Sequence, residues 1–134
     1  MKQIIIPREV EEIATLAVDA AFSVHKELGA GLLESAYEAC FAHELRLRGV
    51  KYQSQVPVPL NYKSKLVEAG FRADIIIEQR LLMELKAVEE IVPVHHAQVI
   101  TYLKILRLPL GLLINFNVPL IKDGIHRILN LHLP

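Results

Sequence analysis

Two neighbouring apolar segments carry ionisable side chains where buried strands are expected. Asp74 lies in the first segment, and Glu84 and Lys86 lie in the second. Burying a lone charge is unfavourable, so such groups persist where they pair with each other or bind an ion. Two carboxylates favour a hard cation such as Mg²⁺ or Mn²⁺. Beside that ion, Lys86 could hold or activate a water molecule that attacks a phosphate.

This chemistry depends on the direction in which the side chains point. Alternate residues of a strand share a face, so Glu84 and Lys86 point the same way. If the two segments form a hairpin centred on Gln79, Asp74 lies opposite Glu84 on that face. Such a hairpin needs an odd turn of about three to five residues, and this turn has no glycine for a left-handed position. A cross-strand ion pair without a catalytic role is the other interpretation, and these residues alone leave both open.

A glutamate also lies on the apolar face of an expected helix. Glu34 and Tyr37 follow Gly31 at a spacing that places both on one face. The carboxylate is either a first-turn charge that stabilises the helix dipole or a ligand directed at a site, and the pattern by itself favours the dipole. Tyr37 is typical of a core residue with a satisfied hydroxyl. Glu38 is expected to be solvated.

A later expected helix carries a polar stripe beside its apolar face. His95, Gln98 and Tyr102 recur there at helical spacing. Such a stripe could hold a substrate phosphate or a metal-bound water, or it could be an exposed helix side. The pattern favours the exposed reading for His95 and leaves both readings open for Gln98 and Tyr102.

Composition limits the classes of protein. The 134 residues fit one domain, residues 1–134. Fifteen basic and fifteen acidic side chains give zero formal net charge, so any surface for nucleic acid must be a local patch. Low net charge with 52% hydrophobic residues also favours a homo-oligomer. Cys40 is the sole cysteine, and neither a signal peptide nor a membrane span is predicted, so a cytoplasmic protein is expected.

Periodicity predicts three helices and several strands. Helices are expected at about residues 7–28, 32–48 and 93–107. Strands are expected at 51–62 (one or two, either at an edge or bulged, because of Pro57 and Pro59), 66–78, 81–86, 110–115 and 125–131. The order ααββββαββ predicts an α/β (α+β) fold in which helices pack on a sheet.

Several of these residues together resemble a known family. Gly31-x-x-Glu34-x-x-Tyr37 is similar to the signature of the bacterial GxxExxY proteins, which are placed in the PD-(D/E)XK nuclease superfamily. Asp74 matches the aspartate of the superfamily motif, with Ala73 where the motif has proline, and Glu84-Leu85-Lys86 matches its (D/E)XK element. Gln98-x-x-x-Tyr102 resembles the Gln-x-x-x-Tyr element of RecB-type nucleases. The resemblance extends from the first helix through Asn115 and Phe116.

This resemblance implies a restriction-endonuclease-like core, a central mixed sheet flanked by helices, and metal-dependent cleavage of phosphodiesters. It implies that Mg²⁺ or Mn²⁺ is held by Asp74, Glu84, the Leu85 carbonyl and Glu34, the last directly or through water. The implied catalytic residues are Lys86, which positions the nucleophilic water, and Glu34, Gln98 and Tyr102, which support the site and the scissile phosphate.

Nucleic acid, DNA rather than RNA, is the expected partner. The residues expected to contact it are Arg72, Lys51 and Tyr37. Neutral charge and small size also support an alternative, a nucleic-acid-binding or regulatory module that keeps the fold without turnover. A third hypothesis is an oligomeric interaction protein that uses exposed apolar surface.

Overall fold

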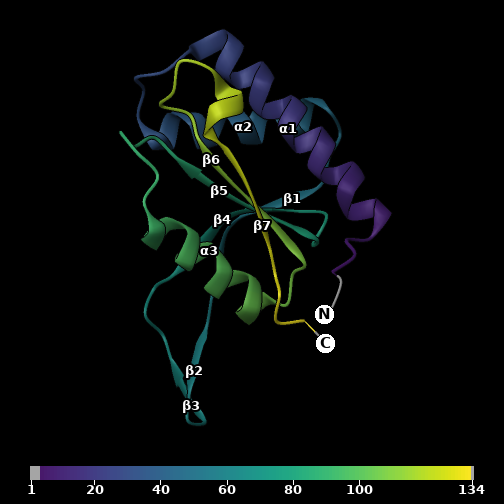
Figure 1. The fold of residues 1–134 in the computed structure, drawn as a ribbon, viewed down its shortest axis with the longest axis vertical. Helices are drawn as coiled ribbons and strands as arrows, with labels where there is room; N and C mark the ends of the chain where they lie inside the picture. The colour runs from purple at the N-terminus through teal and green to yellow at the C-terminus, as the bar shows by residue number, and fades with distance from the viewer. Residues whose placement is uncertain (1–3, 134) are drawn as a thin grey trace.

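The computed structural model describes residues 4–133, and in this part of the chain helices cover both faces of a mixed sheet (Figure 1). The helices are α1 (Arg8–Leu28), α2 (Glu34–Leu47), α3 (Pro93–Leu106) and the short 3-10 helix η1 (Ile121–Gly124). The strands are β1 (Tyr52–Pro57), β2 (Leu60–Tyr62), β3 (Lys65–Val67), β4 (Arg72–Ile77), β5 (Leu81–Lys86), β6 (Leu110–Asn115) and β7 (Ile125–Leu129). This α+β architecture confirms the predicted restriction-endonuclease-like class.

Five strands form the main sheet in the order β1-β4-β5-β6-β7, so β5 is the central strand. β5 and β6 are parallel, and the other neighbouring pairs are antiparallel. Parallel neighbours need a crossover connection, which α3 provides. The sheet is therefore mixed, as predicted, and α3 lies on the face opposite to α1 and α2 (Figure 1).

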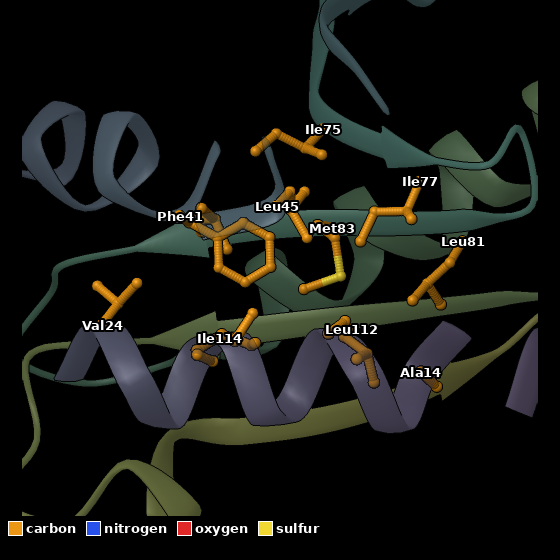
Figure 2. Packing of buried hydrophobic residues seen from close by; sticks show 14 of the residues in the cluster. Ala14, Val24, Phe41, Leu45, Ile75, Ile77, Leu81, Met83, Leu112 and Ile114 are labelled. Atoms are coloured by element: carbon orange, nitrogen blue, oxygen red, sulfur yellow. The ribbon is translucent and has the colours of Figure 1, made fainter. Parts of the chain in front are cut away.

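The two faces of the sheet have separate apolar cores. Alternate residues of β5 divide between them: Leu81, Met83 and Leu85 face α1 and α2, whereas Leu82 faces α3. Figure 2 shows the first core, where Phe41 from α2 packs beside strand residues such as Met83. The second core is smaller. The α3 face thus leaves room for polar side chains at its edge.

The turn between β4 and β5 determines which face each side chain takes. Ile77 pairs with Leu81, so three residues, 78–80, form the turn, and the register is centred on Gln79. Glu78 and Gln79 adopt left-handed backbone angles, with φ of 52° and 58°. Non-glycine residues adopt this conformation at a modest energetic penalty. The predicted odd turn is confirmed, and it forms without glycine.

The continuous strand expected over 66–78 is wrong. β3 ends at Val67, and the chain enters the main sheet only at Arg72, the first residue of β4. Gly70, with a φ of 76°, lies at the bend between the two strands. β2 and β3 instead pair with each other as a separate two-stranded arm, which Figure 1 shows projecting away from the body. Five strands therefore precede α3, one more than predicted. The alternation in 66–78 could not reveal where the chain bends.

Candidate active site

Asp74 and Glu84 lie where β4 and β5 separate. Backbone pairing of the two strands ends at Ile75 and Met83. Beyond this pair, the strands are joined by hydrogen bonds from backbone N–H groups to the two carboxylate side chains. The backbone N–H of Asp74 donates to Glu84 Oε1 at 2.9 Å, and that of Leu85 donates to Asp74 Oδ2 at 2.8 Å. Each carboxylate is therefore oriented by a backbone N–H of the opposite strand.

The two carboxylates and Lys86 lie together beside the α3 core. Asp74 meets Glu84 through the two hydrogen bonds between the strands, and Glu84 and Lys86 have the parity of Leu82, which belongs to the α3 core. Glu84 is only 3% exposed, whereas Asp74 and Lys86 are half-buried. The structure thus brings together the three side chains on which the sequence hypothesis depends.

Burial and mutual repulsion disfavour the charged forms of both carboxyl groups. Burial, followed by the negative charge of Asp74, raises the pKa of Glu84 from 4.5 to about 8. Burial is also the largest cause that raises the pKa of Asp74. The hydrogen bonds from the opposite strand and the positive charge of Lys86 act in the other direction. Two carboxylates that repel in a buried site are what a bound cation would stabilise, and their oxygens suit Mg²⁺ or Mn²⁺.

Glu34 approaches this pair but does not complete a cluster. It is the first residue of α2 and is exposed, and its negative charge contributes to raising the pKa of both Asp74 and Glu84. Within residues 4–133, no three His, Cys, Asp or Glu side chains are gathered closely enough to hold a metal ion. Glu34 would therefore act through water or after a change of rotamer.

Two further polar side chains reach the site, and the sequence interpretation missed both. Glu38, expected to be solvated, is half-buried and has a raised pKa because of burial and, to a lesser extent, the charge of Asp74. Gln55 donates from Nε2 to Glu38 Oε1 at 2.6 Å. Glu38 follows Glu34 by one helical turn, so helical spacing could have indicated it. Nothing in the sequence marks Gln55, because its role depends on the backbone of an edge strand.

The polar stripe of α3 faces the carboxylates at two of its three positions. Gln98 Nε2 donates to the Tyr102 hydroxyl at 3.2 Å. Tyr102 is 4% exposed, and burial, followed by the charges of Glu84 and Asp74, raises its pKa. His95 instead stabilises the start of the helix, because its Nδ1 accepts the Val92 N–H at 3.1 Å. Gln98 and Tyr102 therefore adjoin the site.

The prediction that Tyr37 contacts nucleic acid is wrong, because its side chain is fully buried. Its hydroxyl donates to the Gly29 carbonyl at 2.6 Å and accepts the Leu32 N–H at 3.2 Å. Its ring stacks on Phe116, with the centroids 4.7 Å apart. Tyr37 thus fixes the loop that leads into Glu34.

The other two residues expected to bind nucleic acid lie in different places. Arg72 is exposed at the first position of β4 and has the parity of Asp74, so it lies on the face of the site. Lys51 precedes β1, and its backbone exchanges hydrogen bonds with Glu78 in the β4–β5 turn. It therefore lies at the far end of the strands from Asp74, and the structure does not bring it to the site.

Asp74 and Glu84 separate two strands, and Lys86 follows Glu84 by two residues. This arrangement agrees with the family to which the sequence is matched. A family model described as the PD-(D/E)XK nuclease superfamily matches residues 11–128. The chain belongs to this superfamily. Its match spans every element from α1 to β7. Searches of curated proteins and of solved structures found no match.

Membership of the PD-(D/E)XK superfamily gives the site a nuclease-type context. The superfamily typically uses divalent metal ions and acts on nucleic acid, which agrees with the oxygen donors on the α3 face. None of the helices in residues 4–133 is long and apolar enough to cross a membrane.

Proposed function

We propose that this protein is a metal-dependent nuclease that hydrolyses phosphodiester bonds of nucleic acid. The proposal is supported above all by the meeting of Asp74, Glu84 and Lys86 at the point where β4 and β5 separate. A buried carboxylate pair with raised pKa values beside a lysine marks a candidate functional site.

Asp74, Glu84 and the Leu85 carbonyl would hold Mg²⁺ or Mn²⁺, with Glu34 added through water. The bound ion would stabilise the negative charge that develops on the phosphate. Hydrogen bonds from the opposite strand fix the orientation of both carboxylates in advance. Little reorganisation would then be needed when the ion and the substrate bind.

Lys86, together with Gln98 and Tyr102 of α3, would contact the substrate and the attacking water. The Lys86 ammonium lies on the same face as both carboxylates, where it would orient the nucleophilic water toward the phosphorus. The Gln98 amide, aligned by its bond to Tyr102, would donate to a phosphate oxygen. The Tyr102 hydroxyl would keep its proton because its pKa is raised, so it too can donate a hydrogen bond.

Nucleic acid, with DNA preferred, would approach from the end of the sheet that carries the arm. Arg72 stands where the arm joins the main sheet, two residues before Asp74. The arm itself exposes Tyr62, Lys63 and Lys65. Lysines can contact phosphates, and an exposed tyrosine can stack on a base. These groups supply a local positive surface on a chain of zero formal net charge.

Cleavage of single- and double-stranded DNA and of RNA with Mn²⁺ tests the proposal. We expect Asp74→Ala and Lys86→Ala to lose cleavage while their circular dichroism spectra stay unchanged. Lys104→Ala is the matched control, because Lys104 is an exposed lysine on α3, and it should cleave like the wild type. Full activity in either site variant would contradict the proposal. A wild type that neither binds Mn²⁺ nor cleaves would favour a binding module on the same fold.

A further inference from the structure

Gln55 interrupts an otherwise regular edge strand. Ser54 pairs with Ile75 and Val56 pairs with Ala73, so the register places Gln55 directly opposite Asp74. Gln55 itself makes no ladder pair in β1, and its φ is 51°, in the left-handed region. The interruption therefore falls at the strand position that faces a proposed metal ligand.

This backbone conformation is unfavourable for glutamine. A residue with a β-carbon is less stable in the left-handed region than in its usual conformations, because the β-carbon approaches the following carbonyl oxygen. No residue is inserted, because the register is the same on both sides of Gln55, so the distortion is not a β-bulge. Backbone strain of this kind persists where the surroundings hold it, and it concentrates at functional sites.

The contacts of the Gln55 side chain account for the conformation. Its amide donates to Glu38 Oε1 on α2 at 2.6 Å, and the strand register places Gln55 opposite Asp74 on β4, whose charged form its side chain favours. A carboxamide has two N–H donors, so it can hold two carboxylates at once. Because it carries no charge, it holds them without neutralising either, and both stay available to a cation.

We propose that Gln55 is a positioning residue of the metal site, whose amide holds Asp74 and Glu38 in place for the incoming ion. The inference rests on the proposed nuclease function, since it assumes that Asp74 binds the metal. Partners that orient metal ligands typically affect metal affinity by 10–100-fold. The expected consequence of losing the amide is therefore weaker ion binding in a protein that still folds.

The test is the dissociation constant for Mn²⁺, measured by isothermal titration calorimetry without substrate. Gln55→Met keeps the length of the side chain and removes both donors, and Gln55→Gly removes the amide while permitting the left-handed backbone. We expect both variants to bind Mn²⁺ about tenfold more weakly or worse. Gln53→Met is the matched control, because Gln53 is an exposed glutamine two positions away on the same strand, and it should bind like the wild type.

Two outcomes separate this inference from the proposed function. Wild-type affinity for Mn²⁺ in both Gln55 variants would overturn the positioning role and leave the nuclease proposal standing. A wild type that does not bind Mn²⁺, or an Asp74→Asn variant that binds it unchanged, would overturn the proposed function and this inference with it.

Discussion

The two faces of the main sheet use the same strands for different purposes. On the face toward α1 and α2, side chains such as Phe41, Met83 and Ile114 are fully buried, and this core contains no carboxylate. On the face toward α3, the apolar core is smaller and gives way to Glu84, which is buried although its pKa is raised to about 8. Adjacent residues of β5 thus point alternately into an apolar core and toward a site that contains carboxylates.

The difference between the faces indicates how a chain of this size can tolerate a site of repelling charges. Burial of apolar area is the main favourable contribution to folding, and the larger core supplies it away from the site. The α3 face then needs only enough packing to hold Gln98 and Tyr102 beside the carboxylates. Substitutions on the first face should therefore change stability, and substitutions at the site should change chemistry.

The largest effect on stability is expected from a substitution in the core between the sheet and helices α1 and α2. Phe41→Ala removes a fully buried ring and should lower the free energy of unfolding by about 3–5 kcal/mol, measured by urea denaturation. The cleavage rate per folded molecule should fall much less than in Asp74→Ala, because the ring holds α2 in place but is not itself part of the site. A variant that loses activity while keeping its stability would contradict the division between the faces.

The next effect is the pH dependence of stability without divalent ions. Because the pKa of Glu84 rises from 4.5 to about 8 on folding, the folded protein binds the proton of the Glu84 carboxyl group more tightly than the unfolded chain does. The contribution of this protonation to stability is complete below about pH 4.5 and is lost as the pH rises through about 8. Thermal unfolding between these values should show falling stability, of up to a few kcal/mol. Glu84→Gln should flatten the profile, and an unchanged profile would contradict the assignment.

A smaller effect is expected where α3 packs closely on β6. A β-carbon added at Gly111 would lie 2.9 Å from Val99 Cγ1 and 3.5 Å from Leu103. Gly111→Ala should therefore push α3 outward and lower the free energy of unfolding by about 1–3 kcal/mol, with reduced cleavage because Gln98 and Tyr102 move with the helix. Thr101→Ala, at an exposed position of α3, is the control. Wild-type stability and cleavage in Gly111→Ala would show that the packing adapts without moving the helix.

The smallest effect is expected at the surface. Arg127 makes two hydrogen bonds to the Glu11 carboxylate, at 2.7 and 2.8 Å, but both side chains are more than 40% exposed. Glu11→Gln should change the free energy of unfolding by less than about 1 kcal/mol and leave cleavage unaffected. A larger loss in chemical denaturation would mean that the link between α1 and β7 is more than a solvated ion pair.

Periodicity predicted the elements that span the core, and parity predicted the shared face of Asp74 and Glu84. The prediction failed over residues 66–78, since a largely apolar segment looks alike in one long buried strand and in two strands joined by a bend at Gly70. The interpretation of Tyr37 as a core residue with a satisfied hydroxyl is confirmed, and only its assignment to nucleic-acid contact was wrong. The role of Gln55 at the site could not be predicted, because its contacts depend on a left-handed backbone conformation. No glycine near it in the sequence indicates that conformation.

The three-residue turn between β4 and β5 also limits how this protein can vary. Deleting or inserting one residue there would shift the pairing by one position and rotate Asp74 to the opposite side of the sheet from Glu84. Changes of two residues preserve the alignment. Natural variants and engineered loops at this turn should therefore differ in length by even numbers, because a graft that ignores this rule would also turn Ile75 and Ile77 out of the apolar core.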